Sequence, residues 1–246
     1  MPNQEYLDSS VHWKLRSGAA SFDEPRYDDA VRSILDCGLA TEVLLRIGSG
    51  KEADVYACRD DRGLLAVKVY RLYRTSHRGG GPVKQELMGH RAAHELEMLT
   101  SAWRGRARVP EPGLRFENMF SMEYLGSEDG PAPRLSSVTA ADPARMFAAV
   151  LDQVRALADA GVVHTDLSPF NVLVHRGEPW VIDLGQAVRV DRLGASPWMR
   201  LTEAGEALGR GLRTFDRYFR RYGLRVAVDE EVARILAALD RFGVLR

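Results

Sequence analysis

Residues 162–186 read V-V-H-T-D-L-S-P-F-N-V-L-V-H-R-G-E-P-W-V-I-D-L-G-Q, and this stretch decides the fold. Asp166 is followed by Asn171 five residues later and by Asp183 twelve residues after that. Two short apolar runs separate these polar residues and are typical of strands, with a hairpin turn predicted at 176–179. We therefore expect Asn171 at the start of one strand and Asp183 at the end of the next, beside Asp166 on the preceding loop.

The spacing H-x-D-x-x-x-x-N, followed by a hydrophobic residue and D-x-G, fits the chemistry of phosphoryl transfer. That chemistry needs a carboxylate to orient or deprotonate the attacking hydroxyl, and oxygen ligands to hold Mg²⁺ on the phosphates. We assign the first role to Asp166 and metal binding to Asn171 and Asp183, and we count Asp183 as catalytic too. A polar loop beside a hairpin is the alternative, but spacing, residue type and strand context agree with the catalytic interpretation.

Composition sets the outer limits on the fold and the function. The chain has 246 residues, 45% hydrophobic and 28% charged, enough for one domain with two lobes or for two small domains. Its formal net charge is zero, so no global field favours nucleic acid or a membrane. Cys37 and Cys58 lack metal-type spacing, and no signal peptide or membrane-length apolar run is evident. We expect a cytoplasmic protein without membrane contact.

A glycine-rich turn between two strand-like segments indicates a loop that covers a nucleotide. A helix is expected over 25–37, with Ala30, Val31, Ile34 and Leu35 on one face and Gly38 as its stop. The strand at 43–47 then leads into G-S-G-K-E-A-D-V-Y at 48–56. Because a second strand leaves the turn, the segment is a hairpin rather than a Rossmann turn. Glycines let backbone amides approach phosphate oxygens closely. The predicted nucleotide contacts here are Gly48, Ser49, Gly50, Lys51 and Val55.

The next strand, L-L-A-V-K-V-Y at 64–70, contains a lysine whose burial is costly unless its ammonium has an anionic partner. In kinases such a lysine contacts the α- and β-phosphates and a helix glutamate. A helical pattern over 83–103 supplies Glu95 as the first choice of partner for Lys68, with Glu97 as the fallback. The alternative for Lys68 is an edge-strand position facing water. His90 and His94 on the same helix are spaced for a metal, but a solvated face explains them better.

The segments that follow suggest a hinge and then a helical region. Strands are expected near 114–116 and 119–124, followed by a Gly/Pro-rich break at 126–133 that serves as the hinge. Residues 122–125 would lie along an adenine ring, with Met122 and the backbone of Glu123 and Leu125 as contacts. Further helices are predicted from Asp142-Pro143 to Gly161, over 197–222 and over 229–242. Gly205, Gly209 and Gly211 weaken the helix at 197–222.

These segments together predict an α+β, bilobal protein-kinase-like fold. We expect an extension with a short helix at 1–40, a β-rich N-lobe at 41–125, and a reduced, mainly helical C-lobe at 126–246.

Four pieces of the sequence resemble the RIO family of atypical serine/threonine protein kinases. They are G-S-G-K-E-A-D-V-Y at 48–56, A-V-K-V-Y at 66–70, P-A-P-R-L at 131–135, and H-T-D-L-S-P-F-N with I-D-L-G-Q at 164–171 and 182–186. The resemblance covers about 43–190. It implies ATP with Mg²⁺ or Mn²⁺, Lys68 as the phosphate-binding lysine, Asp166 as the catalytic aspartate, and Asn171 and Asp183 as metal ligands. Thr165 stands where ordinary kinases place an arginine that reads activation-loop phosphate.

The resemblance also carries expectations about activity and partners. It implies phosphorylation of a protein substrate and association with the ribosome or ribosomal RNA. For autophosphorylation by such a kinase, Thr75 and Ser76 in the basic loop are the candidate acceptors. Some family members work as ATPase switches in which the metal-binding aspartate is transiently phosphorylated, a chemistry open to Asp183.

Two alternatives stay open at the level of sequence. A small-molecule phosphotransferase of the aminoglycoside or choline kinase type shares H-x-D-x-x-x-x-N, although the K-E-A-x-V-Y loop argues against it. A non-catalytic, ATP-dependent module that binds ribosomal RNA or a ribosome-associated protein is suggested by the basic segments 71–84 and 104–108.

Overall fold

The computed structural model describes residues 17, 27–50, 52–71, 85–190 and 197–239. Contacts between residues divide the chain into two compact units. The first comprises residues 1–94 and 113–124, and the second comprises 95–112 and 125–246. The second unit therefore takes in 95–112 as well as the region after the predicted hinge. The predicted domain limits at 40 and 125 stay predictions.

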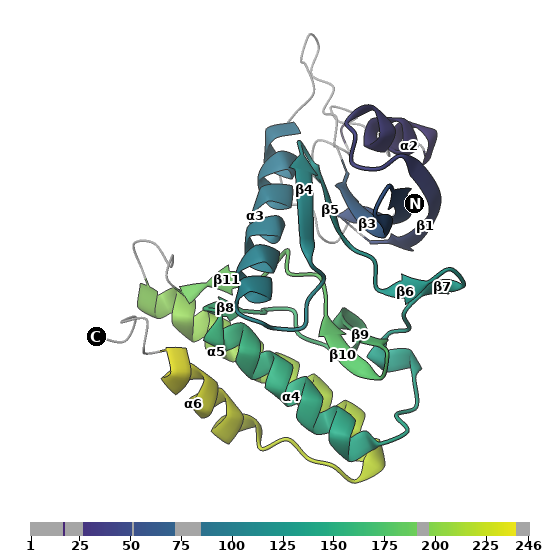
Figure 1. Ribbon diagram of the computed structural model, residues 1–246. Helices are drawn as coiled ribbons and strands as arrows, with labels where there is room; N and C mark the ends of the chain where they lie inside the picture. Colours follow the sequence, from purple (N-terminus) through teal and green to yellow (C-terminus); the bar gives the residue numbers. More distant parts are fainter. Residues whose placement is uncertain (1–16, 18–26, 51, 72–84, 191–196, 240–246) are drawn as a thin grey trace. The chain divides into compact units, whose positions relative to one another are not determined.

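The first unit is built on a five-stranded sheet in the order β1-β2-β3-β5-β4, in which β1, β2, β3 and β5 pair in antiparallel fashion. Figure 1 labels β1, β3, β4 and β5 of this sheet. Its strands are β1 (Glu42–Ser49), β2 (Ala53–Asp60), β3 (Gly63–Tyr70), β4 (Pro112–Phe116) and β5 (Met119–Glu123). β3 lies between β2 and β5, so the edge-strand alternative for Lys68 is wrong. These strands confirm the ones expected from the sequence. They could be predicted because each apolar run has a turn or a glycine at its end.

Helix α2 (Tyr27–Asp36) packs against this sheet and confirms the helix expected over 25–37. Ala30 and Ile34 are buried in one cluster with sheet residues that include Val67. Leu35, predicted on the same face, is 38% exposed. It follows Ile34 by one position and so points about 100° away from it around the helix. Gly38, with φ of +69°, ends the helix as expected.

Helix α3 (Gln85–Arg104) confirms the helical pattern predicted over 83–103. Its buried face includes Met88, Ala92, Glu95, Leu99 and Ala102, which follow one another at a spacing of three to four residues. His90 and His94 are both exposed on this helix.

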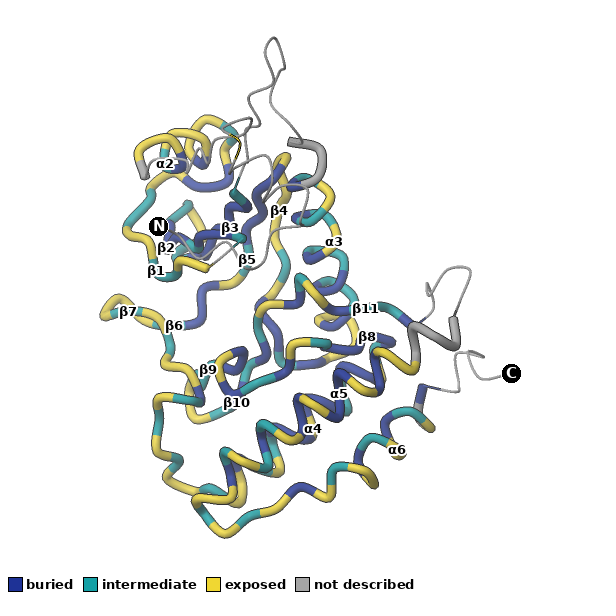
Figure 2. Tube along the Cα trace, turned by 180° about the vertical axis from the view of Figure 1, so that it is seen from behind, coloured by how far each residue is buried: buried dark blue, intermediate teal, exposed yellow. Residues whose placement is uncertain are grey.

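The second unit is mainly helical, as predicted. Its long helices are α4 (Pro143–Asp159), α5 (Pro197–Phe219) and α6 (Val228–Leu239), which bury the faces coloured dark blue in Figure 2. In the described part of this unit they are accompanied by two-stranded sheets, namely β6 (Gly126–Ser127) with β7 (Gly130–Pro131), β8 (Val162–Val163) with β11 (Val188–Arg189), and β9 (Val172–His175) with β10 (Glu178–Val181). Single 3₁₀ turns are η1 (Leu135–Ser137), η2 (Pro169–Asn171) and η4 (Arg220–Tyr222).

Helix α4 begins and ends where the sequence predicts. The side chain of Asp142 accepts a hydrogen bond from the backbone N–H of Arg145 at 3.0 Å, and Pro143 occupies the first turn. Gly161, with φ of +74°, follows its C-terminal end. The helix is thereby set to deliver the chain into β8 and the loop that carries Asp166.

Two turns differ from expectation. The break predicted at 126–133 contains the β6–β7 hairpin, and the N–H of Ala132 donates to the carbonyl of Leu125 at 2.8 Å. The turn predicted at 176–179 is only two residues long, because Arg176 and Gly177 both have positive φ, the geometry of a tight hairpin turn. Glu178 and Pro179 belong to β10 instead.

Within the described residues, no helix combines the length and the apolar character that crossing a membrane would require.

Candidate active site

A buried histidine joins the loop of Asp166 to the strand end that carries Asp183. The Nδ1 atom of His164 accepts from the N–H of Asp166 at 3.2 Å, and Nε2 lies 3.1 Å from the carbonyl oxygen of Ile182. These two bonds fit a neutral imidazole with its proton on Nε2. Burial lowers the pKa of His164, although the Ile182 carbonyl and the charges of Asp183, Asp166 and Glu95 act in the opposite direction. The histidine therefore holds the loop as a neutral group.

Asn171 fixes the carboxylate of Asp166 from the other side. Its Nδ2 donates to the carbonyl of Asp166 at 2.8 Å and to Oδ2 of the same residue at 3.2 Å. The backbone carbonyl of Asn171 accepts a hydrogen bond from the N–H of Ile182 at 3.0 Å. The structure thus brings Asp166, Asn171 and the residue preceding Asp183 together. The β9–β10 hairpin, which the sequence pattern predicts, places Asn171 next to Ile182.

Asp183 follows β10 with a positive φ of +64°. Among non-glycine residues, aspartate is one of the few that adopts this conformation readily. Both Asp183 and Asp166 are exposed, whereas Asn171 is buried. Two exposed carboxylates and one buried amide therefore lie in the segments at the same end of the β9–β10 hairpin. Oxygen is the ligand type that Mg²⁺ prefers.

The segment after Asp183 is held by the loop that precedes Asp166. The hydroxyl of Thr165 donates to the carbonyl of Gln186 at 2.6 Å. Val163 pairs with Val188 in the β8–β11 sheet, and Leu184 is fully buried. Thr165, which replaces the arginine of ordinary kinases, thus has a structural contact of its own.

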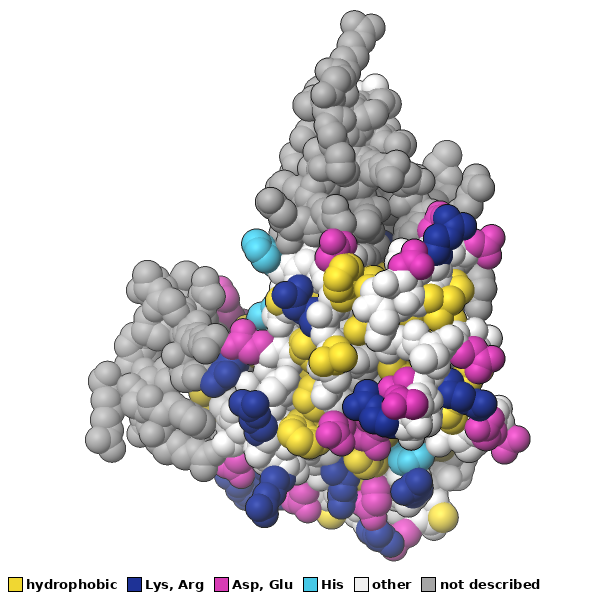
Figure 3. Space-filling view, turned by 45° about the horizontal axis from the view of Figure 1, so that its top comes forward, with side chains coloured by type: hydrophobic (Ala, Val, Ile, Leu, Met, Phe, Trp, Pro, Cys, Tyr) yellow, Lys and Arg dark blue, Asp and Glu magenta, His cyan; other side chains and the backbone are white. Residues whose placement is uncertain are grey.

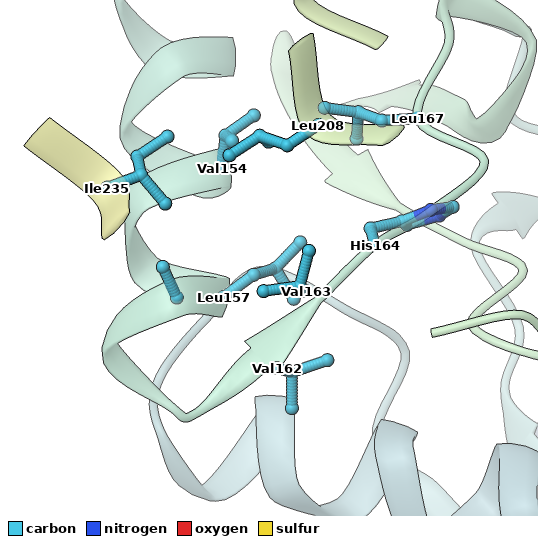
Figure 4. Close-up of a pocket in the computed structure, with 9 residues that line it drawn as sticks. Val154, Leu157, Val162, Val163, His164, Leu167, Leu208 and Ile235 are labelled. Carbon is cyan, nitrogen blue, oxygen red and sulfur yellow. The ribbon is translucent and has the colours of Figure 1, made fainter. Parts of the chain in front are cut away.

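Helix α5 packs against Leu167, in the same loop as Asp166. A Cβ at Gly211 would lie 2.7 Å from Cβ and 2.9 Å from the carbonyl oxygen of Leu167, so only glycine fits at this contact. Beside it, a cavity of about 10 Å³ is lined by Val154, Ile235, His164 and other residues of the second unit, shown in Figure 4. That volume is at the lower limit for one water molecule and excludes a nucleotide.

Lys68 lies in the first unit, where it is 9% exposed and its Nζ is 5.4 Å from the centre of the Tyr70 ring. It stands opposite Val55 on β2 and Phe120 on β5. Glu95 is 4% exposed and belongs to the second unit. Glu97 forms an ion pair with Arg189 at 3.7 Å, which makes it the poorer choice as a partner of Lys68.

The remaining predicted nucleotide contacts divide into two groups. Val55 and Met122 belong to one apolar cluster on the sheet with Ala57, Ala66 and Tyr124, a surface suited to a flat ring. Gly48 and Ser49 end β1, and Gly50 follows them at the start of the β1–β2 turn. Across that turn the N–H of Gly50 donates to the carbonyl of Ala53 at 2.9 Å.

The structure describes two of the three further predicted nucleotide contacts, Glu123 and Leu125. Glu123 is exposed and Leu125 is buried. The Leu125 carbonyl already accepts the N–H of Ala132. Lys51 lies outside the described residues.

Within the described part of the chain, no group of three or more His, Cys, Asp and Glu side chains could hold a metal ion. A metal at this site would rely on the carboxylate of Asp183, the amide oxygen of Asn171 and oxygens of the nucleotide. Because Nδ2 of Asn171 faces Asp166, its Oδ1 is the atom left for a metal, so the donor set fits Mg²⁺ or Mn²⁺.

The family model described as RIO domain matches residues 54–232. The chain belongs to the RIO domain family. Rio1 of Haloferax volcanii, a RIO-type serine/threonine-protein kinase, is 36% identical over 191 residues, which cover 72% of this chain and 63% of that protein. Serine/threonine-protein kinase RIO1 of Homo sapiens is 28% identical over 198 residues, which cover 72% of this chain and 34% of that protein. The chain thus spans between about a third and two thirds of these relatives.

Solved structures confirm the kinase-like α+β fold of this RIO domain. The Rio2 kinase from Chaetomium thermophilum is similar with a TM-score of 0.61 and 21% identity, covering 96% of this chain and 82% of that chain. Its complex described as ADP/Mg²⁺-phosphoaspartate has a TM-score of 0.60, also with 21% identity, covering 96% of this chain and 80% of that chain.

Sequence reasoning missed three residues that hold the site. His164 was quoted only as part of a motif, Thr165 only as a replacement, and Gly211 only as a residue that weakens a helix. The glycine carried a signal, since a helix interior that tolerates Gly often does so for close packing.

Proposed function

We propose that this RIO domain is an ATP-dependent serine/threonine protein kinase acting in the cytoplasm on a protein substrate. The observation that carries the proposal is the bidentate hold of Asn171 on Asp166. It presents an exposed carboxylate in a fixed orientation, as a base must be to receive a proton from a hydroxyl. The relatives that share the domain are named serine/threonine-protein kinases.

In this proposal Asp166 orients the acceptor hydroxyl and takes up its proton as the new P–O bond forms and ADP leaves. Neutral His164 keeps the loop in place without adding charge, since its two bonds satisfy both ring nitrogens. Asn171 and Asp183 would hold Mg²⁺ or Mn²⁺, which when bound neutralises charge on the phosphates.

We assign the nucleotide contacts by unit. In the first unit, the glycine turn at Gly48 to Gly50 and the ammonium of Lys68 would lie against the phosphates, and Val55 and Met122 would meet the adenine. Glu123 and Leu125 would supply backbone contacts to the same ring. Lys51 is proposed as a further phosphate contact, and Glu95 as the partner of Lys68, on the sequence motif alone.

A second outcome of the same site is ATP hydrolysis through Asp183. One structural neighbour is described as a phosphoaspartate complex, which favours this candidate. Here an oxygen of the Asp183 carboxylate would attack the γ-phosphorus and the bond to ADP would break. Water would then attack the acyl phosphate and release inorganic phosphate and the free carboxylate.

The candidate autophosphorylation sites Thr75 and Ser76 lie outside the described residues.

RNA is not part of the proposal. Arg108, in the basic segment predicted as an RNA contact, forms an ion pair with Glu178 at 3.1 Å. On the face seen in Figure 3, basic and acidic side chains are interspersed rather than gathered by sign. The segment 71–84 lies, apart from Arg71, outside the described side chains.

The test is turnover of labelled ATP with Mg²⁺ by the parent and by Asp166→Asn. Loss of a general base lowers turnover by about 10²- to 10⁴-fold, and nucleotide binding should persist. Asp129→Asn, at an exposed aspartate in the β6–β7 turn, is the matched control. Equal turnover by the parent and Asp166→Asn would refute the role of Asp166.

A further inference from the structure

The glycine-rich hairpin of the first unit is held at its base by one arginine. Nη2 of Arg71 donates to Oγ of Ser49 at 2.9 Å and to Oδ1 of Asp54 at 3.1 Å. The backbone N–H of Arg71 donates to the carbonyl of Glu52 at 2.9 Å. A residue at the end of β3 thus contacts both sides of the glycine turn.

This contact is buried on both sides. The side chain of Arg71 is 11% exposed and that of Asp54 is 8% exposed. A charge pair with little water around it is screened weakly by salt. Removing one partner leaves the other as a buried charge without compensation. The base of the hairpin is therefore fixed under ordinary solution conditions.

A second arginine, from a different element, holds the hairpin closer to its tip. Arg91 on α3 forms an ion pair with Glu52, whose side chain lies two residues beyond Gly50. The two side chains are 39% and 32% exposed. Water and salt reach this pair, so it is weaker than the Arg71–Asp54 pair and open to screening.

Backbone amides bind phosphate only when the chain that carries them is ordered, and glycines make that order costly. We propose that Arg71 and Arg91 are positioning residues for the glycine-rich hairpin, and that the Arg91–Glu52 ion pair sets the rate at which nucleotide leaves. The inference rests on the proposed function, because it takes the hairpin as the phosphate-binding element. The Arg71–Asp54 ion pair orders the hairpin at all salt concentrations, and the Arg91–Glu52 ion pair orders it to a degree that depends on salt.

The first readout is dissociation of the fluorescent probe N-methylanthraniloyl-ADP with Mg²⁺, followed by stopped flow at low salt. Arg91→Ala and Glu52→Ala should each raise the dissociation rate by about 1.5- to 5-fold, the range for an exposed ion pair. The double variant should be no faster than the faster single variant, because both changes remove the same interaction. The differences should shrink at high salt.

Arg62→Ala is the matched control. Arg62 pairs with Asp60 at 2.9 Å at the opposite end of β2, and its side chain is 80% exposed. This variant removes one arginine from the β2–β3 turn of the same unit and should leave the dissociation rate unchanged. Additive effects of Arg91→Ala and Glu52→Ala, or an equal effect of Arg62→Ala, would overturn the proposal.

The second readout needs no nucleotide. Amide hydrogen exchange of the nucleotide-free protein should show faster exchange over 48–54 in Arg91→Ala and unchanged exchange over 114–123. Unchanged exchange over 48–54 would overturn the hold on the hairpin itself. A parent protein that binds no ADP would instead refute the proposed function and the link to nucleotide release, while the exchange result would still decide whether Arg91 orders the hairpin.

Discussion

Nδ2 of Asn171 donates to both the carbonyl and the carboxylate of Asp166, at 2.8 Å and 3.2 Å. The amide therefore has two tasks in the proposed site, since its nitrogen orients the base and its oxygen is left for a metal. These tasks can be separated by substitution.

Asn171→Asp keeps an oxygen ligand but loses the N–H donor, and places a second negative charge beside Asp166. We expect the Mg²⁺ concentration for half-maximal turnover to stay within a few fold, while kcat falls by about 10- to 100-fold, the usual cost of losing a residue that orients an active-site group. Steady-state kinetics at several Mg²⁺ concentrations measures both. A rise in the Mg²⁺ requirement with unchanged kcat would show that orientation of Asp166 is not the role of the nitrogen.

Gly211 and Gly209 lie on the same helix, and substitution of each by alanine should change the free energy of unfolding in opposite directions. A Cβ at Gly211 would meet Leu167 at 2.7 Å, including backbone at 2.9 Å, so Gly211→Ala should destabilise by about 1–3 kcal/mol and lower kcat by shifting the loop of Asp166. A Cβ at Gly209 would meet nothing closer than the flexible end of Arg213 at 3.6 Å. Gly209→Ala should stabilise by about 0.5–1 kcal/mol through helix propensity.

Urea denaturation of both variants checks the two signs. If Gly211→Ala were as stable and as active as the parent, the close approach of α5 to Leu167 would not be a constraint on the site.

His164 should make stability depend on pH below neutrality. Its pKa in the folded protein is lowered by burial, whereas the unfolded chain has the ordinary value of about 6.5. Above that value both states are neutral at this residue. As the pH falls below it, only the unfolded state takes up the proton, so the free energy of unfolding decreases until the folded-state pKa is reached.

The slope from this single group is at most about 1.4 kcal/mol per pH unit. His164→Gln removes the titrating group, so the drop in unfolding free energy between pH 7.5 and 5.5 should be smaller in the variant than in the parent. Urea denaturation at both pH values gives the comparison. Identical drops would mean that His164 is already protonated in the folded protein at pH 5.5.

Much of the site could be predicted because it is local in sequence. Asn171 contacts Asp166, and its backbone meets Ile182, the residue before Asp183, at one end of a tight hairpin. Strand-like runs with a turn between them define that hairpin directly. Lys68 was placed on a strand by the same kind of pattern. These features need no knowledge of which distant segments meet.

The supporting contacts could not be predicted for the opposite reason. Gly211 meets Leu167, and Arg91 meets Glu52, across 44 and 39 positions of the chain respectively. Neither pair has a periodic signal. The exposure of Leu35 was missed because its position at the edge of the apolar stripe of α2 depends on where the sheet lies. The turn at Arg176-Gly177 was drawn too long because Pro179 normally marks turns, whereas β10 belongs to a sheet of only two strands, where proline is tolerated.

The most direct test of the account is the chemical nature of the phosphate that labelled ATP leaves on the protein. The parent with Mg²⁺ should acquire acid-stable label on serine or threonine, and Asp166→Asn should acquire about 100-fold less or lower still. Label that hydroxylamine removes would locate the chemistry at a carboxylate such as Asp183 and favour the ATPase outcome. Absence of both label and ATP hydrolysis in the parent would contradict the assignment of Asp166, Asn171 and Asp183 to phosphoryl transfer.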